Sequence, residues 1–254
     1  MLPFDVVIPA RYGSTRLPGK PLLDIAGKTL IQRVYDCARA SHASQVVVAT
    51  DDRRILEAVA KFGGEAQMTS LEHTSGTDRI AEVVHRLRLD ANRIVVNLQG
   101  DEPLMPGALV DQVATTLAQN PDAMAATACY PIQHAVELND PNVVKVVMDE
   151  RGYALYFSRA PVPYPRFPEP DTVSGYRHIG VYAYRVSDIL AFTRLPPSAL
   201  ELTEGLEQLR MLQTGNRIVV CVAENIPGEG VDTVEDLERA RRQFARNVVG
   251  ERNG

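Results

Sequence analysis

The chain has 254 residues, a formal net charge of −5 and a hydrophobic content of 45%, which is typical of an ordinary soluble globular protein. A chain of this length can bury its own core, and one domain over residues 1–254 is expected. The acidic balance argues against general nucleic-acid binding. No apolar stretch approaches the roughly 20 residues needed to cross a bilayer, so membrane insertion is not expected.

The N-terminus and the cysteines indicate the compartment. The opening residues MLPFDVV lack the cationic start and apolar core of a secretory signal. Cys37, Cys129 and Cys221 are isolated and lack metal-ligand spacing. We therefore expect a cytoplasmic protein in a reducing environment, without a zinc site.

The first half of the chain alternates short apolar runs with amphipathic helical patterns. Strands are predicted at residues 4–8, 45–50 and 93–99, and helices at 29–40, 51–62, 77–88 and 106–118. This alternation is typical of an α/β fold with a mostly parallel sheet.

The second half has a different pattern. A hairpin is predicted over 142–159, and five prolines within 161–170 indicate an exposed loop or strap. The remaining predicted elements are a strand at 177–185, a helix at 203–213, a strand at 217–224 and a helix at 233–246. Thr233 and Asp236 have capping-box spacing at the start of that last helix. We expect a nucleotide-binding type of core with a β-rich insertion at roughly 125–200.

A cluster of cations follows the first predicted strand, where open α/β sheets bind their ligands. Arg11, Arg16 and Lys20 lie there together with Gly13 and Gly19. Phosphate oxygens suit guanidinium and ammonium groups, and glycines leave backbone N–H groups accessible to a ligand. A solvated loop with incidental charges is the alternative. Neither G-x-x-x-x-G-K-[ST] nor G-x-G-x-x-G is present, so ATPase and dinucleotide interpretations are weak.

Carboxylates follow other predicted strands. Asp101 and Glu102 come directly after 93–99, where a carboxylate can hold Mg²⁺ beside a phosphate, or can simply stabilise a turn. Asp232 precedes the last helix, and a helix-entry role is favoured when it is considered alone. The stretch HTSGTDR, residues 73–79, also suits an ordinary helix N-cap.

The order of these stretches is more specific than any one of them. IPARYGSTRLPGKPL, VATDD, HTSGTDR, NLQGDEP, YALYFSR, RHIGVYAY, LEQLR and GVDTVEDL occur in sequence between Phe4 and about Arg246. In this order they resemble the 3-deoxy-manno-octulosonate cytidylyltransferase family, the CMP-Kdo synthetases of Gram-negative lipopolysaccharide biosynthesis. The opening motif is the strongest single signal.

The resemblance implies transfer of CMP from CTP to the anomeric hydroxyl of Kdo, with release of pyrophosphate and with Mg²⁺ as cofactor. It also implies a nucleotide-sugar transferase type of Rossmann-like fold, with a mixed, mostly parallel sheet flanked by helices. A cytoplasmic homodimer is expected, with the insertion contributing to its interface and to the sugar pocket. Two alternatives stay open: a related acid sugar such as 8-amino-Kdo, and an inactive nucleotide-binding regulatory protein.

The same resemblance implies roles for individual residues. Those matching nucleotide contacts are Ala10, Arg11, Arg16, Lys20, Ser75, Gly76 and Gln99. Those matching metal ligands are Asp101 and Asp232. The expected catalytic residues are these two together with Arg16 and Lys20. Those matching the sugar pocket are Arg159, His178, Tyr182, Glu207 and Gln208. No obvious general base is identified, and no family position maps onto the proline-rich segment 161–170.

Overall fold

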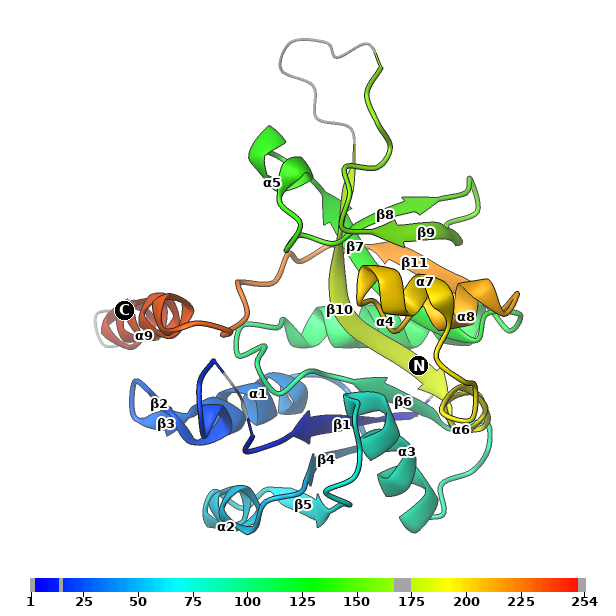
Figure 1. Cartoon of the computed structure of the whole chain (residues 1–254). Helices are drawn as coiled ribbons and strands as arrows, with labels where there is room; N and C mark the ends of the chain where they lie inside the picture. The colour runs from blue at the N-terminus through cyan, green and yellow to red at the C-terminus, as the bar shows by residue number, and fades with distance from the viewer. Residues whose placement is uncertain (1–2, 14–15, 167–174, 251–254) are drawn as a thin grey trace.

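The computed structural model describes residues 3–13, 16–166 and 175–250, with side chains as far as residue 246 (Figure 1). The strands are β1 (Phe4–Ala10), β2 (Asp24–Ile25), β3 (Lys28–Thr29), β4 (Gln45–Thr50), β5 (Glu65–Met68), β6 (Ile94–Asn97), β7 (Ala125–Pro131), β8 (Lys145–Met148), β9 (Ala154–Ser158), β10 (Tyr176–Arg185) and β11 (Ile218–Val222). The helices are the 3₁₀ turn η1 (Lys20–Leu22), α1 (Leu30–Arg39), α2 (Arg53–Lys61), α3 (Gly76–Arg86), α4 (Gly107–Gln119), α5 (Ala135–Asn139), α6 (Val186–Phe192), α7 (Ala199–Glu204), α8 (Leu209–Gln213) and α9 (Val234–Gly250). Among the described residues, no helix combines the length and apolar character that a bilayer span requires.

The central sheet is mixed and mostly parallel, as predicted. Its strand order is β11-β7-β10-β6-β1-β4-β5, and the β8–β9 hairpin joins it through β10. Strand β1 is parallel to β4 and β6, and β11 is parallel to β7, whereas β10 runs antiparallel to both of its neighbours. The carboxyl ends of the parallel strands therefore meet at one edge, where α/β sheets bind ligands.

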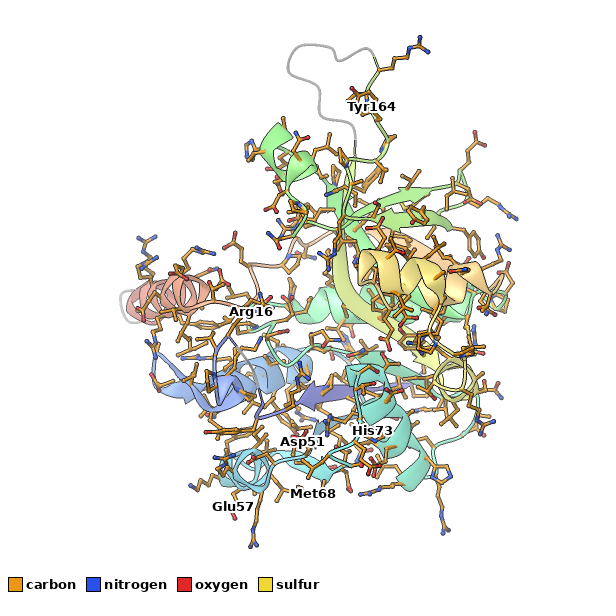
Figure 2. The ribbon with its side chains drawn as sticks, viewed as in Figure 1. Arg16, Asp51, Glu57, Met68, His73 and Tyr164 are labelled. Atoms are coloured by element: carbon orange, nitrogen blue, oxygen red, sulfur yellow. The ribbon has the colours of Figure 1, made fainter. Side chains whose placement is uncertain are left out.

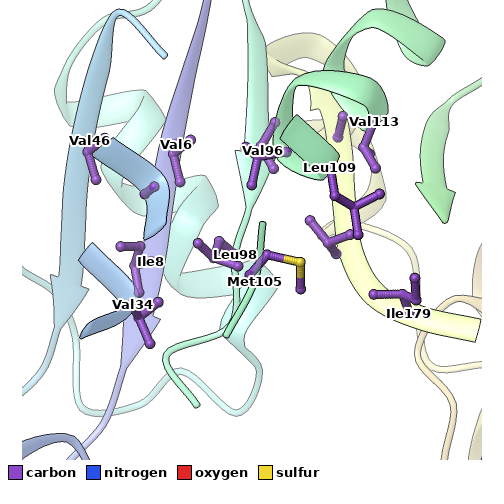
Figure 3. Close-up of a cluster of buried hydrophobic side chains, with 14 of the residues drawn as sticks. Val6, Ile8, Val34, Val46, Val96, Leu98, Met105, Leu109, Val113 and Ile179 are labelled. Carbon is purple, nitrogen blue, oxygen red and sulfur yellow. The ribbon is translucent and has the colours of Figure 1, made fainter. Parts of the chain in front are cut away.

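Alternating side chains of the sheet form two apolar layers. Val6 and Ile8 of β1 pack in one layer with α1 and α4, and Figure 3 shows this layer with Leu109 and Val113. Val7, between them in sequence, belongs to the other layer, which α3, α6 and α8 cover. Because successive side chains of a strand point to opposite faces, one buried strand supplies both layers.

One predicted helix requires correction, and one short strand was missed. The helix predicted at 203–213 is two helices, because α7 ends at Glu204 and Gly205 adopts the left-handed conformation, with φ of 62°. Strand β5 was not predicted, because its sequence EAQM has neither an apolar run nor strict alternation. The hairpin is confirmed as β8 and β9, which turn at Gly152 with φ of 82°.

The part of the chain outside the central sheet is shorter than the insertion predicted at 125–200. Strands β7 and β10 lie inside the sheet, between β11 and β6. Outside the strand order given above, α5, the β8–β9 hairpin and residues 161–166 lie at the top of Figure 1. Of the five prolines, Pro168 and Pro170 lie outside the described residues, as do Ser14 and Thr15 of the cationic loop.

Candidate active site

A pocket of about 300 Å³ lies at the carboxyl edge of the sheet. The loops after β1 and β6, the start of α3 and the loop before α9 form it. Figure 2 labels Arg16 on the first of these loops and His73 just before α3. All the residues predicted to contact nucleotide or metal line this pocket: Ala10, Arg11, Arg16, Lys20, Ser75, Gly76, Gln99, Asp101 and Asp232.

Lys20 lies at the centre of the charged group in this pocket. Its Nζ atom is 2.7 Å from Asp101 Oδ2 and 3.1 Å from Asp232 Oδ1, and its side chain is only 14% exposed. Burial alone would lower the pKa of Lys20, but the two carboxylates offset this effect and raise the pKa above its ordinary value. Arg16 lies 3.6 Å from Asp232 and is 67% exposed, so this ion pair contributes little to stability. Arg16 can therefore reorient toward a ligand at low cost.

A backbone hydrogen bond joins the two segments that carry the carboxylates. The N–H of Val231 donates to the carbonyl of Asp101 at 2.8 Å. This bond places Asp232, the next residue, beside Asp101 even though the two are distant in sequence. Both carboxylates then face Lys20 at the start of η1. The structure thus brings Asp101 and Asp232 together around one ammonium group.

Gly19 has a different role from the one predicted. Its N–H donates to the carbonyl of Tyr12 at 3.2 Å, so it is not available to a phosphate. Its φ is 67°, and a Cβ atom here would lie 3.0 Å from the Tyr12 hydroxyl. The Arg54 guanidinium covers the same ring at 3.3 Å from its centroid. Glycine is therefore needed for the left-handed turn that presents Lys20.

The residues predicted to contact the nucleoside are held by local structure. Ser75 is the N-cap of α3 and accepts a hydrogen bond from the N–H of Asp78 at 3.0 Å, so the N-cap interpretation of HTSGTDR is confirmed. Gly76 packs against the end of β1, where an added Cβ atom would lie 3.2 Å from Pro9 Cγ. Gln99 donates to Asn97 Oδ1 at 3.0 Å. These contacts fix the positions of Ser75, Gly76 and Gln99 in the wall of the pocket.

His178 and Tyr182 lie close together on β10. Their ring centroids are 5.4 Å apart, and His178 Nε2 lies 3.0 Å from Thr127 Oγ1. The Thr127 hydroxyl donates to the carbonyl of Val181 at 2.8 Å, so Nε2 is the donor toward Thr127 and Nδ1 is left as an acceptor. Burial of the imidazole lowers the pKa of His178 to about 3, so the ring is neutral at physiological pH. The buried Tyr182 hydroxyl has no hydrogen-bond partner among the described residues.

Of the other predicted sugar contacts, Glu207 and Gln208 lie between α7 and α8, and Arg159 follows β9. Glu207 accepts a hydrogen bond from the Thr77 hydroxyl at 2.7 Å, and burial raises the pKa of its carboxyl group above the ordinary value. Gln208 is buried at the N-cap of α8. The Arg159 guanidinium donates to the backbone carbonyls of Glu204 and Pro141, at 2.7 and 2.8 Å. Its guanidinium forms no ion pair with any described residue, although the Glu204 carboxylate accepts a hydrogen bond from the backbone N–H of Arg159 at 2.9 Å.

Sequence reasoning assigned no role to the buried Arg79, and it named Glu102 only as a possible cation ligand or turn residue. Arg79 lines the pocket, is 3% exposed and donates to Asp51 at 2.7 Å. Burial, together with Asp101 and Asp232, raises the pKa of Glu102 to about 7. Arg79 and Asp51 belong to the HTSGTDR and VATDD motifs, so motif membership could have identified them.

The carboxylate pair fits the divalent cation that was expected. Asp101 and Asp232 direct one oxygen each toward the same point, at which the Lys20 ammonium lies. Mg²⁺ prefers hard oxygen ligands and commonly binds through one or two carboxylates plus substrate phosphates. No cluster of three or more acidic, histidine or cysteine ligands occurs in the described part of the chain. The pair is thus suited to a cation that arrives with a phosphate ligand.

Comparison with known proteins identifies the family. The Cytidylyltransferase family profile matches residues 6–218. A 3-deoxy-manno-octulosonate cytidylyltransferase of Idiomarina loihiensis is 53% identical, over 94% of this chain and 97% of the relative. Its counterpart in Hahella chejuensis is also 53% identical, over 97% of this chain and 100% of the relative.

Solved structures lead to the same assignment. A CMP:2-keto-3-deoxy-manno-octonic acid synthetase complexed with CTP superposes with a TM-score of 0.90 at 45% identity, covering 96% of this chain and 99% of that one. A cytidylyltransferase of Leptospira borgpetersenii, 18% identical with a TM-score of 0.61 over 95% of this chain and 86% of that one, shares the fold. The chain therefore belongs to the 3-deoxy-manno-octulosonate cytidylyltransferase family.

Proposed function

We propose that this chain transfers CMP from CTP to the anomeric hydroxyl of Kdo, forming CMP-Kdo and releasing pyrophosphate. The observation that carries the proposal is the pocket in which Lys20 lies between Asp101 and Asp232, with Arg11 and Arg16 beside it. A triphosphate needs such a set of cations. The family relationship supplies the identity of the nucleotide and of the sugar.

In the proposed reaction, the sugar hydroxyl oxygen bonds to the α-phosphorus as the bond to the pyrophosphate oxygen breaks, and the hydroxyl proton is released to solvent. Negative charge then grows on the leaving group. Lys20 and Arg16 neutralise that charge, and Lys20 does so from a largely water-excluded position, where electrostatic stabilisation is strongest. When bound, Mg²⁺ held by Asp101 and Asp232 supplies further charge neutralisation on the triphosphate.

The sugar acid is proposed to bind beside this group through Arg159, His178, Tyr182, Glu207 and Gln208. An arginine without an ion pair suits a carboxylate, because the guanidinium can donate two parallel hydrogen bonds. The unpartnered Tyr182 hydroxyl can bond to a sugar hydroxyl. His178 is neutral and offers Nδ1 as an acceptor. These groups are suited to recognise a polyhydroxy acid.

Product analysis tests the function. Purified protein is incubated with CTP, Mg²⁺ and Kdo, and the CMP-sugar is identified by mass spectrometry. N-Acetylneuraminate serves as the competing acid sugar, 8-amino-Kdo as the near relative, and ATP as the competing nucleotide. CMP-Kdo is the expected main product. Preferential formation of the sialic-acid product, or equal use of ATP, would contradict the proposal.

We expect Arg159→Ala to raise the KM for Kdo by about 10- to 100-fold, because hydrogen bonds to charged groups contribute about 1.5–3 kcal/mol. The KM for CTP should change far less. Arg151→Ala, an exposed arginine at the hairpin turn, is the matched control. Steady-state kinetics with each substrate varied separately gives the result, and equal increases in both KM values would count against a dedicated sugar contact.

We also propose a cytoplasmic homodimer whose product serves lipopolysaccharide biosynthesis. Leu155 on β9 is 61% exposed and Leu202 on α7 is 73% exposed, and α7 contacts β9 through the bonds between Glu204 and Ser158 and Arg159. Exposed leucines on neighbouring elements are suited to an interface between copies.

Light scattering should give twice the chain mass of 27.9 kDa, about 56 kDa. Leu202→Glu should shift this mass toward the monomer, whereas Leu71→Glu, at a site 80% exposed before α3, should not. Monomer alone at micromolar concentration in the unmodified protein would end the dimer proposal.

A further inference from the structure

The loop that carries Asp232 is held by a reciprocal cap at the start of α9. The Asp236 carboxylate accepts hydrogen bonds from the backbone N–H groups of Asp232 and Thr233, at 3.0 and 2.8 Å. The Thr233 hydroxyl accepts in return from the N–H of Asp236 at 3.2 Å. This is the capping box expected from the sequence, with one additional bond, because Asp236 also reaches the residue before the cap.

Further contacts hold the same loop against the strand end that carries Asp101. Val231, which precedes Asp232, donates its N–H to the Asp101 carbonyl at 2.8 Å. Arg239 bonds to Asp236 and to Glu229, with its Nε atom 2.8 Å from Glu229 Oε2. The backbone around Asp232 is thus held on both sides.

The Asp232 side chain itself has little support. It is 53% exposed, and its charged partners are Lys20 and Arg16. Neither partner fixes the backbone from which the carboxylate projects. The direction of the carboxylate therefore depends on the backbone bonds at Val231 and Asp232, and a side chain contributes to only one of these, through Asp236.

We infer that Asp236 is a positioning residue for Asp232, keeping its carboxylate directed at the point that it shares with Asp101. The inference rests on the proposed function, in which these two carboxylates hold the divalent ion. An ordinary cap stabilises only its helix. Because Asp236 also holds the N–H of Asp232, its loss loosens the geometry of the ion site itself. Partners that orient a metal ligand typically contribute about 10- to 100-fold to metal affinity.

The test compares Asp236→Ala with Glu235→Ala. Glu235 lies in the same first turn and carries the same charge, but its side chain is exposed and makes no hydrogen bond or ion pair with described residues. Binding of Mn²⁺ in the presence of CTP is measured by electron paramagnetic resonance. The Mg²⁺ concentration for half-maximal rate and the KM for Kdo are measured in parallel, with circular dichroism as the folding control.

We expect Asp236→Ala to weaken Mn²⁺ binding about tenfold or more and to raise the Mg²⁺ requirement similarly, with the KM for Kdo unchanged. Asp236→Asn keeps an acceptor oxygen but loses the charge that strengthens its bonds to the N–H groups of Asp232 and Thr233, so it should weaken Mn²⁺ binding measurably but less than alanine does. If the alanine variant does not fold, unchanged Mn²⁺ binding in Asp236→Asn overturns the inference. Glu235→Ala should bind like the unmodified protein.

A folded Asp236→Ala protein that melts earlier but binds Mn²⁺ normally would show that Asp236 is only a helix cap and would overturn the inference. Equal weakening by Glu235→Ala would also overturn it, since the effect would then be one of helix charge. Absence of Mn²⁺ binding in the unmodified protein would contradict the proposed metal site, and the inference with it. If the unmodified protein and Asp236→Ala both bind Mn²⁺ normally, the result contradicts the inference and leaves the proposed metal site intact.

Discussion

Asp232→Asn should fold normally and lose about 100-fold or more of its turnover, because the change keeps the side-chain shape and removes the charge that holds the divalent ion. The carboxylate is 53% exposed and contributes no core packing, so stability should change little. Asp101→Asn should behave similarly. Turnover is measured at saturating Mg²⁺, with circular dichroism as the folding control.

The double variant separates a shared site from two independent effects. If Asp101 and Asp232 act as one unit, the double variant should be little worse than the worse single variant. Asp90→Asn, an exposed residue after α3, is the matched control and should be fully active. A folded Asp232→Asn protein with near-normal turnover would exclude the shared site, whatever the result at Asp101.

Lys20→Met should slow turnover by about 100-fold, since removing one preorganised partner of the developing charge typically costs 10²–10³ in rate. The ammonium lies 2.7 and 3.1 Å from the two carboxylates. In the absence of nucleotide its loss should therefore leave Mn²⁺ affinity equal or higher, because the competing cation is gone. A lower turnover without weaker metal binding is a combination that simple misfolding does not produce.

Lys61→Met, at the exposed end of α2, is the control for Lys20. Arg16→Ala should reduce turnover less than Lys20→Met, because Arg16 is 67% exposed and water already screens its charge. Normal turnover in both Lys20 and Arg16 variants would remove the cationic loop from the mechanism. Weaker Mn²⁺ binding without CTP in Lys20→Met would contradict the arrangement in which Lys20 competes with the metal.

The sheet and the location of the site could be predicted because their signals are local. Apolar runs identified β1, β4, β6 and β11, and the polar stretches directly after them fell at the carboxyl edge. The spacing of Thr233 and Asp236 predicted the cap of α9, which the structure confirms. Each of these features depends on residues a few positions apart.

Features that depend on distant partners could not be predicted in this way. The bond between Lys20 and Asp101 joins residues 81 positions apart, and the one to Asp232 joins residues 212 apart. Gly19 was expected to offer its backbone N–H to a phosphate, because the sequence does not show that this N–H donates to the carbonyl of Tyr12. Likewise β7 and β10 were placed in an insertion, because strand pairing within the central sheet is a long-range property.

The central claim is that CTP is cleaved in this pocket only by transfer to the sugar acid with a divalent ion present. The most direct test is pyrophosphate release by the purified protein with CTP, Mg²⁺ and Kdo, each omitted in turn. We predict release only in the complete mixture, in a 1:1 ratio to the CMP-Kdo formed. Pyrophosphate release at a comparable rate without Kdo, or without a divalent ion, would contradict this account.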